Sequence, residues 1–456
     1  RPILHSPLGD LHDRQCLLDS NYPGKFFEPI CLSIMVFDGS HHRLSFVALQ
    51  VIFKSVPCSW SRFGGVLFIH VFYVFKRIMQ NKILFLPGLN GIRSLAAIGV
   101  MISHTALAFK NVPSNYHLFG MKNGMPNSWV LGEHGVTMFF VLSGFLITFL
   151  LLNEKQKTNK IHIKSFYRRR ILRIWPLYYL YFIIVFCLFY LVGKPFNFKT
   201  SSPYFYLFFL ANIPFIFEMT LPLLDHFWSI GVEEQFYLFW PWLFRIKDDI
   251  LMKIGIFIVV FLSILRVLLW YYIPFSEPAL FSVVNRFDCM VFGGLGAIFY
   301  FKKNKIFLKF VDNKITQFFA LAILVSMIIN IFSLINSILE IFVVELVTLI
   351  IIVGQINVKN RILNFNNKVM DYLGKLSYGI YVIHVIILYF VFKFFHWSFI
   401  TNELLRIFCI YLTVIIFTII TAHFSYNYFE KYFLKLKNKF AIIKSSSSNT
   451  FDTYKN

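Results

Sequence analysis

Residues 129–152 read WVLGEHGVTMFFVLSGFLITFLLL and contain one formally charged side chain, Glu133. A helix of this length extends about 36 Å, since each residue adds about 1.5 Å, and it can therefore cross about 30 Å of hydrocarbon. Apolar and small residues occupy most of the other positions, so such a helix has no face suited to water. The stretch predicts a membrane-spanning helix.

Similar stretches recur on both sides of this one. The candidate spans are 89–109, 129–152, 171–193, 252–274, 287–301, 316–335, 338–357, 376–395 and 404–424. Two shorter apolar pieces are 203–217 and 232–246. We expect 232–246 to cross and 203–217 to be re-entrant or interfacial. The sequence therefore predicts an all-α, polytopic integral membrane protein with about ten transmembrane helices.

The composition supports this fold class. Of the 456 residues, 57% are hydrophobic and only 14% are charged, against about 25% charged in soluble domains. The formal net charge is +22, but the basic residues form short clusters between apolar segments, at 155–173, 302–314 and 431–439. This pattern is typical of cytoplasmic loops and not of a nucleic-acid-binding face, so the expected partner is a lipid bilayer and not a nucleic acid.

The basic clusters also predict the orientation. Residues 154–173 carry eight Lys or Arg against one Glu, so this segment is expected to be cytoplasmic. The 302–314 segment and the tail after Lys431 should lie on the same side, with 194–231 outside. We expect a multi-pass protein of the cell membrane with both termini in the cytoplasm.

Three segments differ in character. Residues 1–78 lack clear periodicity, and their apolar stretch 63–75 is too short to span a bilayer comfortably. At Met79 the membrane-protein pattern starts abruptly. We therefore predict that 1–78 is a non-native or misassigned extension, that 79–435 is the membrane domain, and that 436–456 is a polar cytoplasmic tail.

Metal and nucleotide motifs are missing from the sequence. The six cysteines show no CxxC and no ligand spacing with histidine, and there is no Walker A loop, GxGxxG or HExxH. We expect no metal and no bound cofactor. ATP-driven transport has no support either.

The first span contains two ionisable residues, Arg93 and His104. Eleven residues is close to three helical turns, so the two lie about 20° apart on one face and about 16 Å apart along the axis. Ionisable groups inside a span indicate a functional site. Arg93 could bind an anionic group, and His104 could take a proton from a hydroxyl. The alternative is a histidine satisfied by a neighbour and an arginine that reaches the lipid headgroups.

Two further arginines lie one turn apart, Arg170 and Arg173. Paired guanidiniums suit phosphate or pyrophosphate recognition, and the alternative is a cluster that only sets orientation. In the second span, the small pair Ser143-Gly144 would let another backbone or a ligand chain approach closely.

The segment DHFWSIGVEEQFY, residues 225–237, places the two carboxylates of Glu233 and Glu234, together with Trp228, at a membrane boundary. Glu233 and Glu234 face different sides of a helix, so at most one should line a cavity, with the other solvated. Trp228 could be an interfacial anchor only. His384 lies in an aromatic helix, where packing is its expected role.

Taken together, these motifs resemble the membrane-bound acyltransferases of acyltransferase family 3, over residues 86–433. The elements arrive in the family's order: Arg93 with His104, then FFVLSGFL from Phe139, then Arg170 with Arg173. WSIGVEEQFY from Trp228, LGKLSYGIY from Leu373, and Glu430 complete the pattern.

The resemblance implies transfer of an acyl group, most often acetyl, from cytoplasmic acyl-CoA to a hydroxyl of a cell-surface polysaccharide, a lipopolysaccharide or a lipid-linked precursor. His104, Glu233 and Glu234 would be catalytic. Arg93, Arg170 and Arg173 would bind acyl-CoA, while Ser143, Trp228 and Tyr237 would contact the acceptor. His104 could act as a base or carry the acyl group covalently, and the sequence leaves both open.

Two positions depart from the family pattern: Asn90 and Thr137 stand where Asp is usual, and we expect effects on local helix capping only. Some members append a hydrolase-like module, whereas 26 residues follow Glu430 here. We therefore expect action alone or with separate polysaccharide-assembly proteins. The alternative from another class is a polysaccharide or lipid-linked sugar transporter without acyl transfer, which has no need to recognise CoA.

Overall fold

The computed structural model describes residues 32–37, 44–49, 84–109, 118–122, 124–193, 203–329, 337–443 and 445–446. The chain divides into two units, Arg1–Gln80 and Asn81–Asn456. In the first unit, the described residues form strands β1 (Leu32–Phe37) and β2 (Leu44–Leu49), which pair antiparallel. The prediction about residues 1–78 falls largely outside the described residues and stays a prediction.

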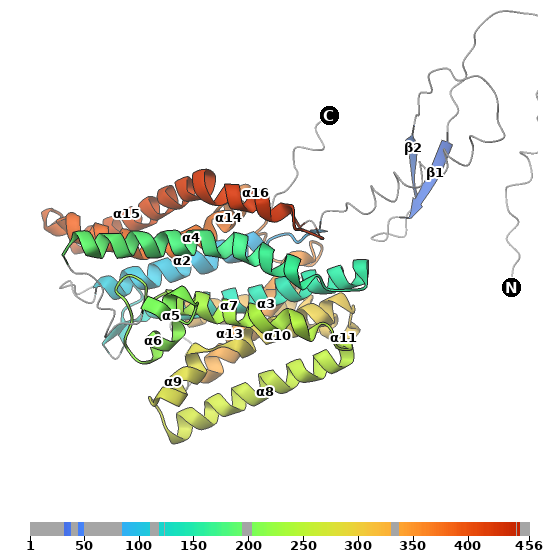
Figure 1. Ribbon diagram of the computed structural model, residues 1–456, viewed down its shortest axis with the longest axis horizontal. Helices are drawn as coiled ribbons and strands as arrows, with labels where there is room; N and C mark the ends of the chain where they lie inside the picture. The colour runs from blue at the N-terminus through green and yellow to red at the C-terminus, as the bar shows by residue number, and fades with distance from the viewer. Residues whose placement is uncertain are drawn as a thin grey trace, which may run out of the picture. The chain divides into compact units, whose positions relative to one another are not determined.

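The second unit is a bundle of long helices (Figure 1). These are α2 (Leu89–Ala108), α3 (Val130–Thr158), α4 (Ile163–Leu191), α7 (Phe227–Leu243), α8 (Asp248–Tyr272), α10 (Phe287–Phe301), α12 (Lys314–Ile328), α13 (Ser337–Ile356), α14 (Lys368–Phe394) and α15 (Glu403–Phe424). Eight spans in the described ranges are long and apolar enough to cross a membrane, or nine with the bent pair of α11 (Lys305–Val311) and α12. With the 17-residue α7, they match the ten expected crossings.

Shorter elements connect the long helices. They are α5 (Pro203–Leu207), α6 (Asn212–Ile216), α9 (Glu277–Val284), α16 (Lys431–Asn438), the 3-10 helices Asn127–Trp129 and Trp397–Phe399, the π-helical segment Ser425–Glu430, and strands β3 (Leu84–Phe85), β4 (Met121–Lys122), β5 (Met125–Pro126) and β6 (Ser445–Ser446). Strand β3 pairs with β6, and β4 pairs with β5. The chain is an all-α polytopic membrane protein, as predicted.

Several helix boundaries differ from the prediction. Residues 154–173, expected as a loop, belong almost entirely to α3 and α4, with only 159–162 between the helices. Lys, Glu, Gln and Arg favour helix, so both helices continue beyond their apolar parts. Helix α7 begins five residues before the expected 232, and α16 continues to Asn438, past the expected domain limit at 435. Residues 203–217 form α5 and α6, which are too short to span.

Asparagine residues mark the start of four helices. The side chains of Asn304, Asn313, Asn367 and Asn402 each accept a hydrogen bond from a backbone N–H two or three residues later. These bonds satisfy amide groups that have no partner within the helix. The polar residues between apolar runs thus define where α11, α12, α14 and α15 begin.

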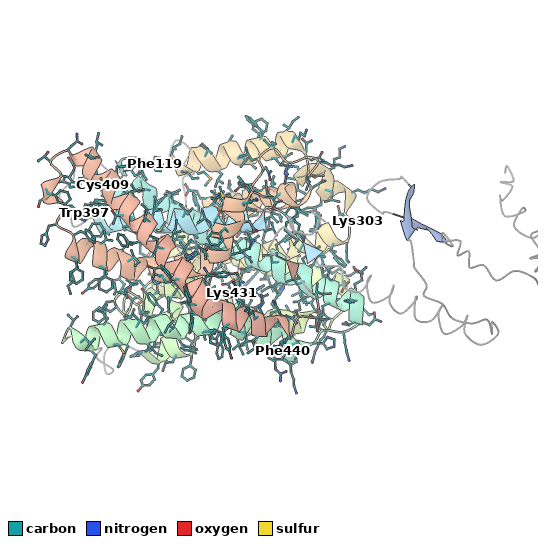
Figure 2. All side chains as sticks on the ribbon, turned by 90° about the horizontal axis from the view of Figure 1, so that it is seen from above. Phe119, Lys303, Trp397, Cys409, Lys431 and Phe440 are labelled. Atoms are coloured by element: carbon teal, nitrogen blue, oxygen red, sulfur yellow. The ribbon has the colours of Figure 1, made fainter. Side chains whose placement is uncertain are left out.

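The two ends of the bundle differ in charge. Figure 2 places Phe119, Trp397 and Cys409 at one end and Lys303 toward the other. The end with Lys303 is also where α3 finishes and α4 begins, since Lys155 pairs with Asp248 and Lys302 pairs with the adjacent Asp249. This end therefore carries the basic residues of 155–173. We call it the basic end. Positively charged residues are therefore enriched at one end of the bundle, as expected for a protein that crosses a membrane.

Helix α3 lies at the centre and packs most extensively against α10 and α2. Two glycines permit the close α3–α10 contact. A Cβ atom at Gly144 would lie 1.8 Å from the carbonyl oxygen of Met290, and one at Gly293 would lie 2.0 Å from that of Val141. The prediction that Ser143-Gly144 allows close backbone approach is confirmed, and the neighbouring backbone is that of α10.

Replacing Gly293 with alanine is expected to destabilise the protein by about 3 kcal/mol, because the added methyl forces α3 and α10 apart. The measurement is thermal unfolding in detergent. Gly99→Ala is the matched control, since a Cβ there meets its nearest atom at 3.3 Å. Equal unfolding midpoints for the two variants would contradict the close packing of α3 on α10.

Candidate active site

A cleft with about 690 Å³ of empty space, including the part that is open to solvent, lies between α2, α3, α4, α7 and α14. Its lining residues are Arg93, Val136, Phe139, Phe140, Ser143, Arg170, Arg173, Ile174, Ser229, Ile230, Glu233, Tyr237, Ser377, Tyr378 and Tyr381. Six of the nine predicted site residues are among them, although they come from four separate helices: Arg93, Ser143, Arg170, Arg173, Glu233 and Tyr237. The fold thus brings together residues up to 144 positions apart in the sequence.

Glu233 is the carboxylate of the cleft. Its Oε1 accepts hydrogen bonds from the hydroxyls of Ser143 and Tyr237. Tyr237 follows Glu233 by four residues and so lies on the same face of α7. The Arg170 guanidinium lies 5.4 Å from the centre of the Tyr237 ring. These contacts hold the carboxylate in one position and link it to the arginine side of the cleft.

Glu234 lies on the neighbouring face of α7 and does not line the cleft. Its Oε2 accepts a hydrogen bond of 3.0 Å from Trp175 Nε1, and its Oε1 is buried without a hydrogen-bond partner. Only one of the two adjacent glutamates therefore lines the cavity, as expected from helical geometry. The expectation that the other is solvated is wrong, because the indole of Trp175 on α4 covers it.

Three guanidiniums face this cleft. Among the described residues, no carboxylate lies within ion-pair distance of Arg93, Arg170 or Arg173. The adjacent Arg169 behaves differently: its Nη2 pairs with Glu154 Oε2 at 3.1 Å, and Arg169 does not line the cleft. The arginines of the run RRRILR, residues 168–173, thus lie on different faces of α4. Arg169 forms an ion pair within the protein, whereas Arg170 and Arg173 face the cleft, where an anion could bind them.

Asn90 supports Arg93. Its Oδ1 accepts a hydrogen bond of 3.4 Å from Arg93 Nη1, and its Nδ2 donates one of 2.8 Å to Asp371 Oδ1. The residue that precedes α2 and takes the cap position is Gly88, and not Asn90. The expectation that Asn90 affects only local capping is therefore wrong. This residue links Arg93 to α14.

His104 forms a pair with His384 of α14. The His104 Nδ1 and His384 Nε2 atoms lie 2.7 Å apart, and the rings are stacked with centroids 4.9 Å apart. His104 itself does not line the cleft, whereas Tyr381, one turn before His384, does. The prediction that His384 only packs misses this bond. A second histidine within an apolar helix was the only sequence signal for the pair.

Two further cleft residues, Ser229 and Tyr381, were not predicted. The Tyr381 hydroxyl donates to the carbonyl oxygen of His226 at 2.8 Å and lies 2.5 Å from the hydroxyl oxygen of Ser229. These bonds join α7 to α14 beside the histidine pair. Both residues belong to motifs quoted above, but no spacing rule shows that helices 152 residues apart meet there.

Trp228 lies outside the cleft. Its ring is stacked on Phe215 of α6 at 5.4 Å and meets Phe140 edge-on at 6.2 Å. Phe215 thus covers one face of the indole. The predicted contact between Trp228 and a sugar stays a prediction.

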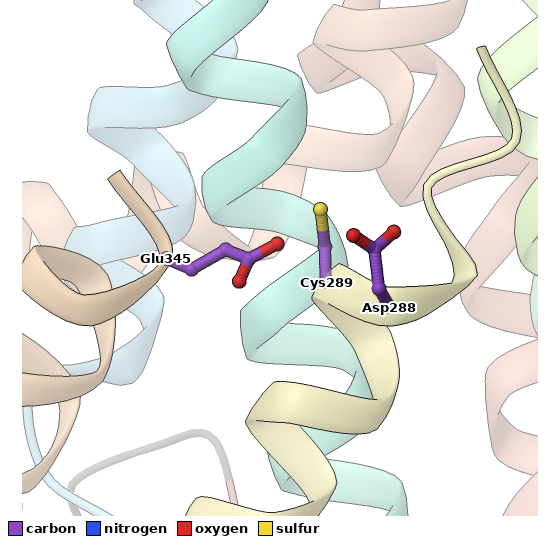
Figure 3. A group of neighbouring side chains, drawn as sticks. All are labelled: Asp288, Cys289 and Glu345. Atoms are coloured by element: carbon purple, nitrogen blue, oxygen red, sulfur yellow. The ribbon is translucent and has the colours of Figure 1, made fainter. Parts of the chain in front are cut away.

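A second group of charged residues is buried in the bundle, and none of its members lines the cleft. Figure 3 shows Asp288 and Cys289 of α10 facing Glu345 of α13. Their candidate ligand atoms lie within 4.8 Å of one another, so the group could hold a metal ion, a site that the sequence did not predict. Arg266 Nη2 pairs with Asp288 Oδ1 at 2.6 Å.

Arg286 adds a second ion pair to this group, with Glu133 Oε1 at 2.9 Å, and also donates to the Thr137 hydroxyl at 2.7 Å. Thr137 is one of the two departures from the family pattern, and its role is this contact and not capping. Two guanidiniums therefore face three carboxylates. Neither oxygen of Glu345 meets an N–H or O–H donor among the described residues.

This imbalance predicts unequal effects of neutralising the two carboxylates. Asp288→Asn should destabilise the protein by about 3–5 kcal/mol, because Arg266 would be left buried and unpaired. Glu345→Gln should change stability by less than about 1 kcal/mol, because no cation within ion-pair distance loses its partner. Thermal unfolding of both variants in detergent tests this, and the opposite ranking would contradict the pairing.

Comparison with known proteins agrees with this site. A family model described as an acyltransferase domain matches residues 86–423. The chain therefore belongs to this acyltransferase family, and the resemblance to acyltransferase family 3 is confirmed. The matched range begins just before α2 and ends within α15, so it contains every residue that lines the cleft.

Among curated relatives, a presumed O-acetyltransferase of Staphylococcus aureus (strain COL) is 28% identical over 382 residues, 78% of this chain and 58% of the relative. The O-acetyltransferase OatA of Staphylococcus aureus (strain NCTC 8325 / PS 47) is 27% identical over 369 residues, 76% of this chain and 57% of the relative. The alignment thus spans somewhat more than half the length of these relatives. No solved structure matches the chain.

Proposed function

We propose that the protein is an O-acetyltransferase that moves an acetyl group from acyl-CoA to a hydroxyl of a cell-surface carbohydrate or its lipid-linked precursor. The names of the relatives support the reaction. The observation that carries the choice of donor is the set of three cleft-facing arginines without a carboxylate partner among the described residues.

The donor would bind through its phosphates. A guanidinium offers two parallel N–H groups that match a phosphate, and such charge-assisted bonds are stronger than neutral ones. Arg170 and Arg173 come from α4 and Arg93 from α2, so a phosphate between them would join two helices. A cluster needed only for orientation would not require its guanidiniums to converge on one cleft.

The basic end would face the cytoplasm, because basic residues gather there and cytoplasmic segments are enriched in Lys and Arg. The protein would then lie in the cell membrane with both ends of its membrane domain in the cytoplasm. Acyl-CoA would meet the arginines from that side. The arm that joins its phosphates to the thioester would extend toward His104, about 16 Å from Arg93 along α2.

His104 would act as a general base that takes the proton of the acceptor hydroxyl while the hydroxyl oxygen attacks the thioester. Glu233, fixed by Ser143 and Tyr237, would accept a hydrogen bond from a second hydroxyl of the acceptor and so orient it. Glu234 would act only through Trp175, and Trp228 would contact the acceptor after moving from Phe215. Polysaccharide-assembly proteins would supply or receive the acceptor.

Membrane vesicles of known orientation test the proposal. Inverted and right-side-out vesicles from cells that produce the protein are given acetyl-CoA with a radiolabelled acetyl group, and label in the carbohydrate fraction is counted. We expect label only with inverted vesicles, since CoA esters do not cross a bilayer unaided. Equal labelling in both would contradict cytoplasmic donor binding, and no labelling in either would contradict the donor.

A further inference from the structure

The hydrogen bonds of His384 determine which of its nitrogens carries the proton. His384 Nδ1 lies 2.7 Å from the carbonyl oxygen of Tyr381 and 3.2 Å from that of Ile380. A carbonyl oxygen can only accept, so Nδ1 must carry hydrogen. In the neutral ring, Nε2 is then a lone pair that accepts a hydrogen bond.

The tautomer of His104 follows. Its Nδ1 lies 2.7 Å from His384 Nε2, and because that nitrogen accepts, His104 Nδ1 must donate. The single proton of neutral His104 is therefore on Nδ1, and its Nε2 carries a free lone pair. Within the described part of the chain, no hydrogen bond engages His104 Nε2.

A third histidine keeps the His384 ring in place. The His226 ring lies edge-on to His384, with centroids 5.2 Å apart and an interplanar angle of 69°. His226 Nε2 donates to the carbonyl oxygen of Val382 at 3.1 Å, on the same turn of α14. His384 is completely buried, whereas His104 is half-buried. His384 is therefore fixed by the protein, and of the two it is His104 that a substrate can approach.

We infer that His384 is the residue that positions His104 for proton abstraction, by binding the Nδ1 proton of His104 and so leaving its Nε2 free as the base. This inference rests on the proposed acyl transfer, and it adds the atom that takes the proton and the residue that keeps it available. His384 does not touch the reacting atoms and is a positioning residue.

The step balances as follows in atoms and protons. The O–H bond of the acceptor breaks, its proton moves to His104 Nε2, and its oxygen bonds to the thioester carbonyl carbon. The bond from that carbon to sulfur breaks, and the departing CoA sulfur takes the proton from His104 Nε2. The products are the ester and free CoA, and His104 returns to its starting tautomer. While His104 is charged, its Nδ1–H stays bonded to His384.

Two substitutions of His384 separate positioning from packing. His384→Phe keeps a ring but removes the acceptor, so His104 can adopt either tautomer. His384→Gln places a carboxamide oxygen close to the position of Nε2, where it can accept from His104. We expect His384→Phe to lower kcat about 100-fold with the KM for acetyl-CoA changed by less than about twofold, and His384→Gln to recover kcat to within about tenfold of wild type.

The control is His423→Phe, at the end of α15, where the histidine bonds to Tyr372 and not to the pair. It should turn over at the wild-type rate. In addition, ¹⁵N NMR of histidine-labelled protein in detergent reports the tautomer directly, with the His104 signals assigned by their loss in His104→Ala. Wild type should show Nδ1 protonated, and His384→Phe should show a mixture.

The outcomes separate this inference from the proposed function. If His104→Ala is inactive but His384→Phe turns over normally, the inference is overturned and the acyl transfer stands. Protonation of His104 on Nε2 in the wild type would also overturn it. If the wild type uses no acyl-CoA, the proposed function fails, whereas the NMR result still reports the tautomer. If His384→Phe does not fold, a loss of kcat beyond about 100-fold in a folded His384→Gln protein would overturn the inference.

Discussion

His104→Ala is expected to lower kcat by about 10³-fold while acetyl-CoA still binds with nearly wild-type affinity. General base catalysis contributes about 10²–10⁴-fold to rates, and among the residues that the structure describes no other imidazole beside the cleft has a free nitrogen that a substrate can approach. Of the other two histidines, His384 is bonded at both nitrogens and His226 is buried. Affinity should persist because none of the donor-binding arginines adjoins His104: Arg93 lies about 16 Å away along α2, and Arg170 and Arg173 belong to α4.

The measurement is kcat for acetyl transfer together with acetyl-CoA affinity, in protein whose thermal unfolding matches wild type. His423→Phe, which replaces a histidine outside the site, is the control and should be fully active. A folded His104→Ala protein with an unchanged kcat would remove His104 from the mechanism. An equal loss of affinity would instead place His104 in donor binding.

The double variant Arg170→Ala/Arg173→Ala is expected to raise the Kd for acetyl-CoA by about 100-fold or more. A hydrogen bond to a charged group contributes about 1.5–3 kcal/mol, and about 1.4 kcal/mol corresponds to a tenfold change in Kd. Both guanidiniums face the cleft. The kcat at saturating donor should change less than the Kd, because neither arginine bonds to the histidine pair.

Arg168→Ala is the matched control, because Arg168 belongs to the same basic run but is exposed and lies over the ring of Phe440, outside the cleft. It should leave the Kd within about twofold of wild type. If Arg168→Ala weakens binding as much as the double variant does, the run acts as a general basic surface. The phosphate-binding assignment would then be wrong.

Most of the fold follows from the apolar runs. Each of the ten expected crossings corresponds to a helix, since a bilayer requires long apolar helices. Helix ends were less predictable: Glu154 to Thr158 and the residues before Arg170 are polar but helical, and hydropathy cannot distinguish a polar helix turn from a loop. The sequence predicted that another backbone approaches Gly144 closely, because small residues indicate such contacts. It did not predict that this backbone is that of Met290 in α10.

The candidate site shows a similar division. The helical spacing of Arg93 with His104 and of Arg170 with Arg173 was readable from the sequence, and so was the division of Glu233 and Glu234 between two faces. The partners across helices were not readable. His384 and His104 are 280 residues apart in the sequence, and the contact between them depends on how α2 packs against α14.

The same packing explains why the transporter alternative is less favoured. A transporter could place charged residues in a cavity, but it has no need for a pair of histidines that leaves one nitrogen basic beside an arginine-lined cleft. The chain also belongs to an acyltransferase family over residues 86–423.

Release of free CoA by the purified protein in liposomes tests the central claim most directly. Acetyl-CoA and a carbohydrate acceptor are added, and the new thiol is followed for wild type and His104→Ala. We predict thiol release that requires the protein and is lost in the variant. A folded wild-type protein that neither binds nor consumes any acyl-CoA would contradict the account and favour transport of the carbohydrate instead.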